Sequence, residues 1–298
     1  MPAAFYEARR TLQRSVRPTL RRIIGPVMGI FCLAACSPAN TISIQALVDA
    51  PPGVTSHFLF PTSGSNAEAY LTRPSGSGPF PLIILLHGHT VGSFGAETMV
   101  PEAEAFARDL CYAGLAVSLP GYGATEVAPG TDPKITLDVI LDAVSLVKKV
   151  AWIDSKRFYL YGFSRGAFYS SLLVNRLDGI EAIVLHSGAY DLNRFYQEAP
   201  WFRSLLNPSG EADPKLISIL PEVSTWNAPT LVLHGERDSL VPVKQATLLR
   251  DSLEAAKKPY RFVLYPDNGH RLPAEDVRKK ATDFLKERSG SACRASTP

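Results

Sequence analysis

One serine of this 298-residue chain has neighbours that could turn its hydroxyl into a nucleophile. Ser164 lies in the run GFSRG at 162–166, between an apolar stretch at 158–161 and another at 167–174. This G-x-S-x-G pattern works where it joins a strand to a helix, because the glycines let the two elements approach closely. The serine oxygen then projects at a helix N-terminus, whose partial positive charge favours a developing oxyanion. The pattern therefore predicts nucleophilic chemistry at Ser164.

A serine hydroxyl needs a base to take its proton, and His270 is placed to supply one. His270 follows the apolar run 262–264, while Asp238 follows the run 230–233. We expect both side chains just past the carboxyl ends of parallel strands, where the ligand sites of open α/β sheets form. The imidazole would act as base near neutral pH, and the carboxylate would fix its tautomer. The alternatives for the acid are Asp267, Glu236 and Asp191.

Four stretches of the chain together resemble the α/β-hydrolase superfamily, in particular its dienelactone-hydrolase and prolyl-oligopeptidase-like branches. They lie between about residues 80 and 285, and are Trp152-Ile153-Asp154, GFSRG, HGERDSLVPVKQ at 234–245 and YPDNGH at 265–270. The chain order Ser, Asp, His is that of the superfamily's triad, and of six histidines only His270 follows Asp238. The resemblance implies Ser164 as nucleophile, Asp238 as acid and His270 as base. This chemistry needs no metal or organic cofactor.

An oxyanion hole should come from two backbone N–H groups. One belongs to the residue after the nucleophile, Arg165. By resemblance to the superfamily's loop after the strand at 82–86, the other belongs to His89, in the run His87-Gly88-His89-Thr90. The sequence leaves open whether the side chain of His89 also faces the substrate or only packs beside the serine. A rival serine, Ser187, lacks the required glycine spacing.

The elements that must position these residues appear as six short apolar runs. They are near-continuously apolar, as strands are when helices cover both faces of a parallel sheet, and they span 82–86, 115–119, 158–161, 182–185, 230–233 and 262–264. Amphipathic helical patterns lie between them. This alternation predicts an α/β fold with a mostly parallel, doubly wound sheet, the architecture of the α/β-hydrolase fold. Upstream, 54–60 and 67–73 are predicted to form an antiparallel hairpin at the sheet edge.

The stretch 188–228 interrupts the alternation of strands and helices. It has no strong strand pattern and contains six aromatic residues, which are Tyr190, Phe195, Tyr196, Trp201, Phe202 and Trp226. Because a long insertion between core strands is usually functional, we predict a small helical cap over the site. The alternative is a surface segment whose aromatic side chains only seat it on the body, that is, pack it against the rest of the domain. In a cap, these aromatics would favour an apolar or aromatic acyl group.

The N-terminus resembles a bacterial lipoprotein signal. Residues 23–35 carry no charge and follow an arginine-rich stretch, and this run is too short to span a bilayer but suits a signal peptide. It ends at Leu33-Ala34-Ala35-Cys36, which resembles the lipobox whose cysteine receives a diacylglycerol. We therefore predict a signal peptide at 1–35, lipidation of Cys36, a tether at 36–50, the hydrolase domain at 51–288 and a tail at 289–298.

The lipid would hold the protein at a membrane surface of the bacterial cell envelope. The alternatives are a plain secretory signal and an uncleaved anchor, with Cys36 incidental. A disulfide between Cys111 and Cys293 is compatible with the sequence but not required by it.

The charge distribution argues against a nucleic-acid partner. The formal net charge is +3, but residues 1–35 hold six arginines and one acid, so the rest carries 25 basic and 27 acidic residues, a net charge of −2. The body therefore has no visible basic face for a polyanion. Four cysteines without a CxxC pair or Cys/His cluster also exclude a disulfide scaffold and give no sign of structural zinc.

We therefore expect a serine hydrolase that cleaves an ester or related acyl bond of a small molecule through an acyl-enzyme. One alternative is a prolyl-oligopeptidase-like peptidase, although the 263 residues from 36 to 298 leave no room for a gating propeller. The other is a non-catalytic surface lipoprotein that uses the fold as a binding module. The natural substrate and the oligomeric state stay open at this stage.

Overall fold

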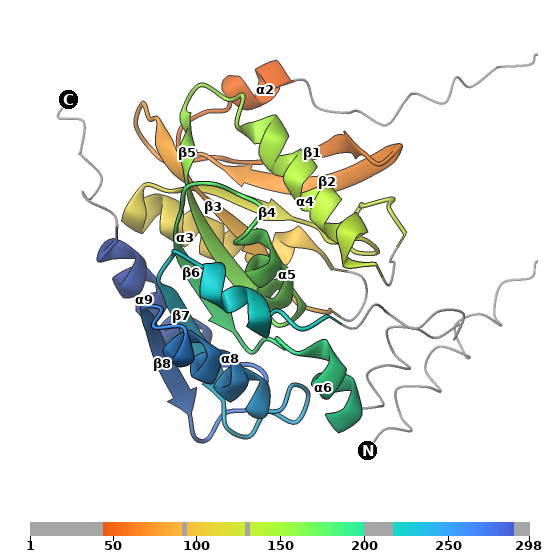
Figure 1. Cartoon of the computed structure of the whole chain (residues 1–298). Helices are drawn as coiled ribbons and strands as arrows, with labels where there is room; N and C mark the ends of the chain where they lie inside the picture. Colours follow the sequence, from red (N-terminus) through yellow and green to blue (C-terminus); the bar gives the residue numbers. More distant parts are fainter. Residues whose placement is uncertain (1–43, 91–93, 129–131, 200–216, 289–298) are drawn as a thin grey trace, which may run out of the picture. The chain divides into compact units, whose positions relative to one another are not determined.

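The centre of the molecule is one eight-stranded sheet (Figure 1). The computed structural model describes residues 44–90, 94–128, 132–199 and 217–288. The chain divides into the units 1–37 and 38–298, and all described residues belong to the second. The strand order is β1-β2-β4-β3-β5-β6-β7-β8, in which β1–β2 and β2–β4 pair antiparallel and all later pairs are parallel. This topology confirms the predicted fold class.

All six apolar runs contribute to strands of this sheet. The strands are β1 (Thr55–Thr62), β2 (Ser65–Thr72), β3 (Phe80–Leu86), β4 (Ala113–Val117), β5 (Ile153–Phe163), β6 (Ile180–His186), β7 (Thr230–Gly235) and β8 (Tyr260–Tyr265). Every residue of β4 and β7 is buried. Strands that are covered on both faces have no solvent side, which is why their sequences do not alternate.

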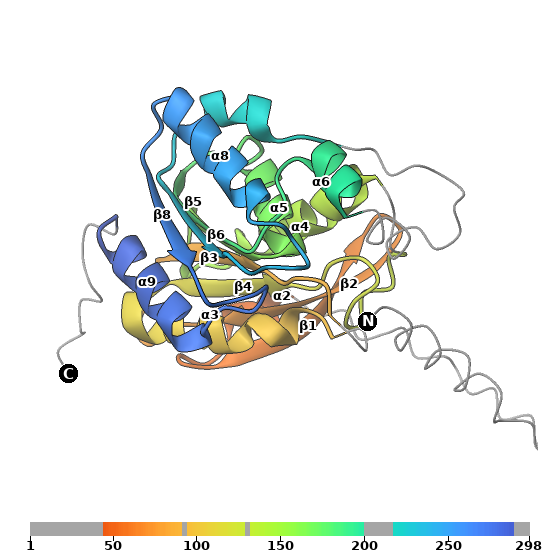
Figure 2. The same cartoon turned by 90° about the horizontal axis from the view of Figure 1, so that it is seen from below.

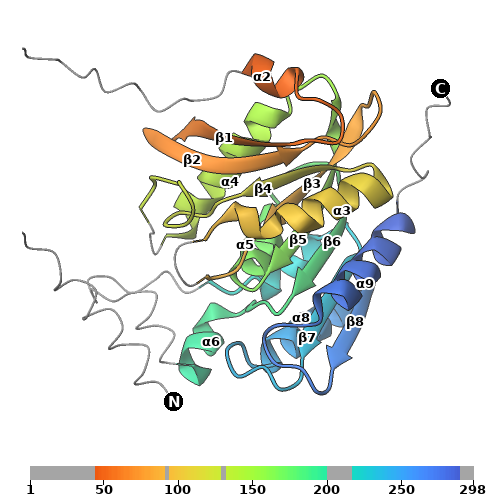
Figure 3. The same ribbon diagram turned by 180° about the vertical axis from the view of Figure 1, so that it is seen from behind.

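Helices cover both faces of the sheet, as Figures 2 and 3 show. Neighbouring residues of β3 point to opposite faces, so Ile83 packs with Phe106 and Phe284 of α3 and α9, while Ile84 shares a core with Leu249 of α8 and with α4 and α5. The helices are α2 (Ile44–Val48), α3 (Val100–Leu110), α4 (Pro133–Val147), α5 (Arg165–Leu173), α6 (Leu192–Glu198), α8 (Lys244–Ala255) and α9 (Ala274–Lys286), with 3-10 turns η2 (Ala96–Met99) and η3 (Leu220–Thr225).

The edge hairpin is longer than its sequence suggests. The predicted strands 54–60 and 67–73 leave residues 61–66 between them, but the actual connection is a two-residue turn, because β1 runs to Thr62 and pairs it directly with Ser65. Ser63 and Gly64 both have positive φ, 48° and 77°, as the central residues of tight hairpin turns do. The polar residues Ser65 and Asn66 thus belong to β2 and not to a loop.

The described part of the stretch 188–228 contains α6 and η3. Its residues 200–216, with Trp201 and Phe202, lie outside the described residues, so the predicted cap stays a prediction. The other four aromatics are buried, and they are Tyr190, Phe195, Tyr196 and Trp226. These four therefore help to seat the stretch on the body, and a contact between them and an acyl group stays a prediction.

The predicted signal peptide, Cys36 and Cys293 also lie outside the described residues. Cys111, which follows α3, is disulfide-bonded. Within the described ranges, no helix is both long enough and apolar enough to cross a membrane.

Candidate active site

Ser164 occupies the sharp turn between β5 and α5. Its backbone has φ 53° and ψ −116°, a conformation that costs free energy and is typical of functional turns. The two flanking glycines are required sterically. A Cβ at Gly162 would lie 2.6 Å from Cα of Ala167, and a Cβ at Gly166 would lie 2.0 Å from the carbonyl oxygen of Leu86. The G-x-S-x-G spacing therefore lets α5 lie directly against β3 and β5.

The structure brings the three predicted triad residues into one hydrogen-bonded chain. Nε2 of His270 lies 2.9 Å from Oγ of Ser164, and Nδ1 of His270 lies 2.8 Å from Oδ2 of Asp238. The other oxygen of Asp238 accepts hydrogen bonds from the backbone N–H groups of Leu240 and Val241, each at 2.9 Å. The carboxylate is thus fixed on both sides before any substrate binds.

Hydrogen bonds from its histidine neighbours keep the carboxyl group of Asp238 ionised. Burial alone would raise the pKa of Asp238, but hydrogen bonds from His234 and His270 hold that pKa well below its usual range. An ionised carboxylate is acceptor-only, so Nδ1 of His270 carries the proton between them. Nε2 is then free to accept the proton of the Ser164 hydroxyl, which is the geometry of a general base.

Asp238 also contacts a second histidine, His234. His234 is completely buried, and its Nε2 lies 2.9 Å from the carbonyl oxygen of Val241 and 3.3 Å from Oδ2 of Asp238. Both neighbours are acceptors, so Nε2 carries a proton and donates. The signal for this contact is the spacing in the run HGERD, where His234 precedes the acid by four residues.

The alternative acids and the rival serine occupy other environments. Asp267 forms an exposed ion pair with Arg237 at 2.9 Å, and Asp191 caps α6 by accepting from the N–H of Arg194. Ser187 is fully buried, and its hydroxyl has no hydrogen-bond partner. Among the candidate acids it is Asp238 that contacts His270.

The loop after β3 passes directly beside the serine. A Cβ at Gly88 would lie 2.9 Å from Cβ of Ser164, so only glycine fits there. The fully buried His87 donates from Nδ1 to the carbonyl oxygen of Gly88 at 2.7 Å and accepts at Nε2 from the N–H of Leu119 at 3.0 Å. Because the N–H and C=O of a trans peptide point in opposite directions, this bond fixes the N–H of His89.

The side chain of His89 packs against the loop after β4. Its Nδ1 is hydrogen-bonded to the hydroxyl of Tyr122, and burial lowers the pKa of His89. The guanidinium of Arg165 lies 5.8 Å from the ring of Tyr122 and 5.6 Å from that of Tyr169, within cation–π range of both. The two predicted oxyanion residues therefore share Tyr122 as a neighbour.

A family comparison agrees with this geometry. The family model described as the prolyl oligopeptidase family matches residues 132–291, which is more than half of the chain. The chain belongs to the prolyl oligopeptidase family. The match spans Ser164, Asp238 and His270, and it confirms the predicted superfamily.

Relatives of this family member carry both peptidase and esterase-type names. It is 23% identical over 245 residues to the uncharacterized peptidase YtmA of Bacillus subtilis, covering 76% of this chain and 91% of that one. It is 27% identical over 267 residues to a putative carboxymethylenebutenolidase of Escherichia coli, covering 81% and 85%. It is 25% identical to dipeptidyl-peptidase 5 of Porphyromonas gingivalis, covering 78% of this chain but 37% of the peptidase.

Solved structures show the same mixture around the family fold. The acylaminoacyl peptidase of Pyrococcus horikoshii superposes with a TM-score of 0.64 at 17% identity, covering 79% of this chain and 42% of the peptidase. The esterase Pf2001 of Pyrococcus furiosus gives the same TM-score and identity, covering 80% and 91%. The chain thus spans less than half of the longer peptidases and most of the esterase. Together with the family match, these relatives support a serine-hydrolase-type enzyme.

Within the described part of this prolyl oligopeptidase family member, no group of three or more His, Cys, Asp or Glu side chains could hold a metal ion.

Proposed function

We propose that this chain cleaves carboxylic esters or related acyl bonds of small molecules through an acyl-enzyme. The observation that supports this proposal most directly is the hydrogen-bonded chain from Ser164 through His270 to Asp238. The three groups have the chemical types and the order that a nucleophile, its base and an orienting acid require.

In the proposed reaction, Oγ of Ser164 attacks the acyl carbonyl while Nε2 of His270 takes the hydroxyl proton. Asp238 stabilises the imidazolium that forms, and the backbone N–H groups of His89 and Arg165 bind the oxyanion. The carbon–oxygen bond of the ester then breaks, and His270 gives its proton to the leaving alcohol. A water molecule, activated by His270 in turn, releases the acid and restores the serine.

Two relatives that the chain covers over most of their length carry esterase-type names, which supports ester cleavage. The chain covers 91% of the esterase Pf2001 and 85% of the putative carboxymethylenebutenolidase, but 42% of the acylaminoacyl peptidase. Peptide hydrolysis is the second candidate, because the family is named for a peptidase and YtmA, also named a peptidase, is covered over 91% of its length. The same triad serves either reaction, so the pocket and not the triad sets this choice.

The decisive experiment is labelling by a fluorophosphonate, which reacts with activated serines. We expect the purified chain to be labelled at one residue and to hydrolyse short p-nitrophenyl esters. Ser164→Ala should lose both properties and keep the wild-type melting temperature. A wild-type chain that is neither labelled nor active on any ester would contradict the proposal and favour a non-catalytic binding module.

The same preparation separates the two candidate activities. A panel of acyl esters of increasing chain length is compared with aminoacyl amides that share the leaving-group chromophore. Higher kcat/KM for esters than for matched amides is expected, and the reverse order would assign the chain to the peptidases.

The proposal extends to location, with Cys36 as a lipidated N-terminus at the cell envelope. The uncharged run 23–35, which follows an arginine-rich stretch and ends at Leu33-Ala34-Ala35-Cys36, supports this location. Expression in bacteria fed an alkynyl fatty acid should label the full-length chain, and Cys36→Ser should abolish that label. Labelling that survives in the Cys36→Ser variant would contradict lipidation at this residue.

A further inference from the structure

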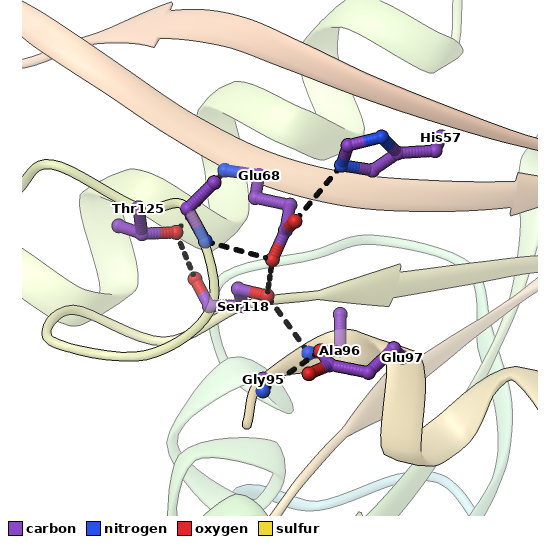
Figure 4. Close-up of polar contacts among 8 residues, drawn as sticks. His57, Glu68, Gly95, Ala96, Glu97, Ser118 and Thr125 are labelled. Carbon is purple, nitrogen blue, oxygen red and sulfur yellow. Dashed lines mark hydrogen bonds and ion pairs between the residues drawn. The ribbon is translucent and has the colours of Figure 1, made fainter. Parts of the chain in front are cut away.

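A buried carboxylate lies beside the active-site loops, on the edge hairpin. Glu68 is in β2 and is only 5% exposed, and Figure 4 shows hydrogen bonds converging on it. Its Oε1 lies 2.8 Å from Nε2 of His57 on β1. Its Oε2 accepts from the hydroxyl of Ser118 at 2.6 Å and from the N–H of Ala124 at 3.1 Å. A buried charge is costly unless donors satisfy it, so these partners hold the carboxylate and are held by it.

The main chain of Glu68 bonds to the same loop, residues 118–125. Its carbonyl oxygen accepts from the N–H of Ser118 at 2.9 Å, and its N–H donates to Oγ1 of Thr125 at 3.1 Å. Thr125 in turn donates to the carbonyl oxygen of Ser118 at 3.0 Å. Glu68 thus fixes both ends of the loop 118–125.

The network also includes residues 95–97, which follow the loop after β3 (Figure 4). The hydroxyl of Ser118 donates to Glu68 and accepts from the N–H of Ala96 at 2.7 Å, at the start of η2. The carboxylate of Glu97 accepts from the N–H of Gly95 at 2.8 Å. One carboxylate therefore holds two loops that come from the carboxyl ends of neighbouring strands, β3 and β4.

The packing leaves these loops little room to shift. A Cβ at Gly123 would lie 1.8 Å from Oε2 of Glu68, and a Cβ at Gly95 would lie 2.3 Å from Oγ of Ser118. The backbone approaches the carboxylate as closely as only glycine permits. A displaced carboxylate would move the loop with it.

Tyr122 connects this network to the active site. It lies inside the loop 118–125, and its hydroxyl is bonded to Nδ1 of His89. Its ring also lies edge-on to His87 at 5.0 Å, and His87 bonds to the loop at Leu119. The peptide between Gly88 and His89, which carries one proposed oxyanion donor, is thus held from the loop that Glu68 fixes.

We propose that Glu68 is a positioning residue for the oxyanion hole, acting through the loop 118–125 and Tyr122 on the N–H of His89. This inference rests on the proposed hydrolase function of Ser164. It predicts an effect on the transition state and not on substrate binding, because the oxyanion exists only after attack.

The test compares Glu68→Gln with Glu181→Gln. Glutamine keeps the shape of Glu68, but it turns one acceptor oxygen into a donor and removes the negative charge shared by the partners His57, Ser118 and Ala124. Glu181 is a matched control, since it is a half-buried carboxylate that accepts from Arg157 at 2.8 Å at the opposite end of the sheet. We expect Glu68→Gln to lower kcat on an ester about tenfold with KM within about twofold, given that one oxyanion donor is typically worth about 10²–10³ in rate. A kcat equal to that of Glu181→Gln would overturn the proposal.

A double-mutant comparison tests whether Glu68 acts on His89 through Tyr122. If Glu68 acts through Tyr122, then Glu68→Gln should cost less activity in a Tyr122→Phe background than in the wild type, because contacting residues of one network do not act additively. If the losses in kcat of the two single variants simply multiply in the double variant, Glu68 does not act through Tyr122.

Amide hydrogen exchange tests the hydrogen bonds of the Glu68 network without an activity assay. The N–H groups of Ala96 and Ala124 donate directly into this network, so Glu68→Gln should speed their exchange while Glu181→Gln does not. Unchanged protection would overturn the proposal, whereas absent ester hydrolysis and labelling in the wild type would overturn the proposed function alone. Should Glu68→Gln fail to fold, Ser118→Ala breaks the relay to Ala96 and is measured in the same way.

Discussion

At the scale of single residues, Asp238 binds two histidines, and only His270 faces the serine. His234 lies behind the carboxylate, where its Nε2–H is placed between the carbonyl oxygen of Val241 and Oδ2 of Asp238. His234 thereby ties the loop that carries Asp238 and Val241 to the end of β7. Hydrogen bonds to a buried charge contribute about 1.5–3 kcal/mol, more than those between neutral groups. His234 should therefore orient the acid that orients the base.

This contact predicts different outcomes for two substitutions of His234. Leucine removes the donor and should lower kcat about tenfold, because Oδ2 of Asp238 loses one of two side-chain donors. Glutamine places an amide N–H near the position of Nε2 and should retain most of the activity. Steady-state kinetics and the rate of fluorophosphonate labelling measure both variants. Equal activity of His234→Leu and wild type would show that Asp238 needs no second histidine.

The sequence identifies the residues whose roles follow from chain order, and it misses those whose roles follow from loop geometry. Ser164, Asp238 and His270 each come just after an apolar run, so parallel pairing predicts that they meet at one edge of the sheet. No local pattern shows that His87 bonds to Leu119, or that Glu68 bonds to Ser118, fifty residues away. Such contacts depend on the order of strands, in which β2 lies next to β4.

At the scale of elements, the site depends on how closely α5 lies against β3. The helix begins at Arg165, and its first turn approaches the carbonyl oxygen of Leu86 at Gly166. That carbonyl belongs to the end of a central strand and cannot move without disturbing the sheet. The serine and the loop after β3 are kept together by this approach.

Gly166→Ala should therefore destabilise the fold strongly. Its Cβ would lie 2.0 Å from the oxygen of Leu86, and we expect the free energy of unfolding to fall by about 3 kcal/mol or more. Gly269→Ala is the matched control, because its Cβ would meet the carbonyl oxygen of Arg237 at an ordinary 3.6 Å. Denaturant unfolding of both variants measures the difference. Similar stabilities would mean that α5 can shift away from β3.

The hairpin and the stretch 188–228 show what sequence patterns leave undetermined about elements, namely strand bounds and side-chain placement. Ser65 and Asn66 look like loop residues, but Thr62 and Pro61 pair with them because a two-residue turn closes the hairpin. From the sequence, Tyr190 and Trp226 could either line a cap or seat the stretch on the body, and both are fully buried. Residue type gives the hydrophobicity of a side chain but not the direction in which the backbone points it.

At the scale of the whole molecule, the core contains imidazoles that stay neutral. Burial lowers the pKa of His87 to about 4 and that of His186 to about 3. His87 uses both ring nitrogens in hydrogen bonds, one as donor and one as acceptor, which only the neutral ring can do. Both ring nitrogens of His186 are buried without a partner, and its ring stacks on Phe163 at 4.8 Å.

These two rings predict a loss of stability in mild acid. Between pH 6.5, where a histidine of the unfolded chain gains its proton, and about pH 4, the unfolded state binds protons that the folded state excludes. The free energy of unfolding should thus be highest above pH 6.5 and fall as the pH drops, by about 2–3 kcal/mol at pH 4 for His87 alone. The lowered pKa of Asp238 affects stability below this window, because an aspartate of the unfolded chain begins to gain its proton only near pH 4. Urea unfolding at pH 7, 6, 5 and 4 measures the slope, which His186→Leu should reduce by removing one of the two rings. A free energy of unfolding that stays constant from pH 7 to pH 4 would mean that both imidazoles can gain protons inside the folded core.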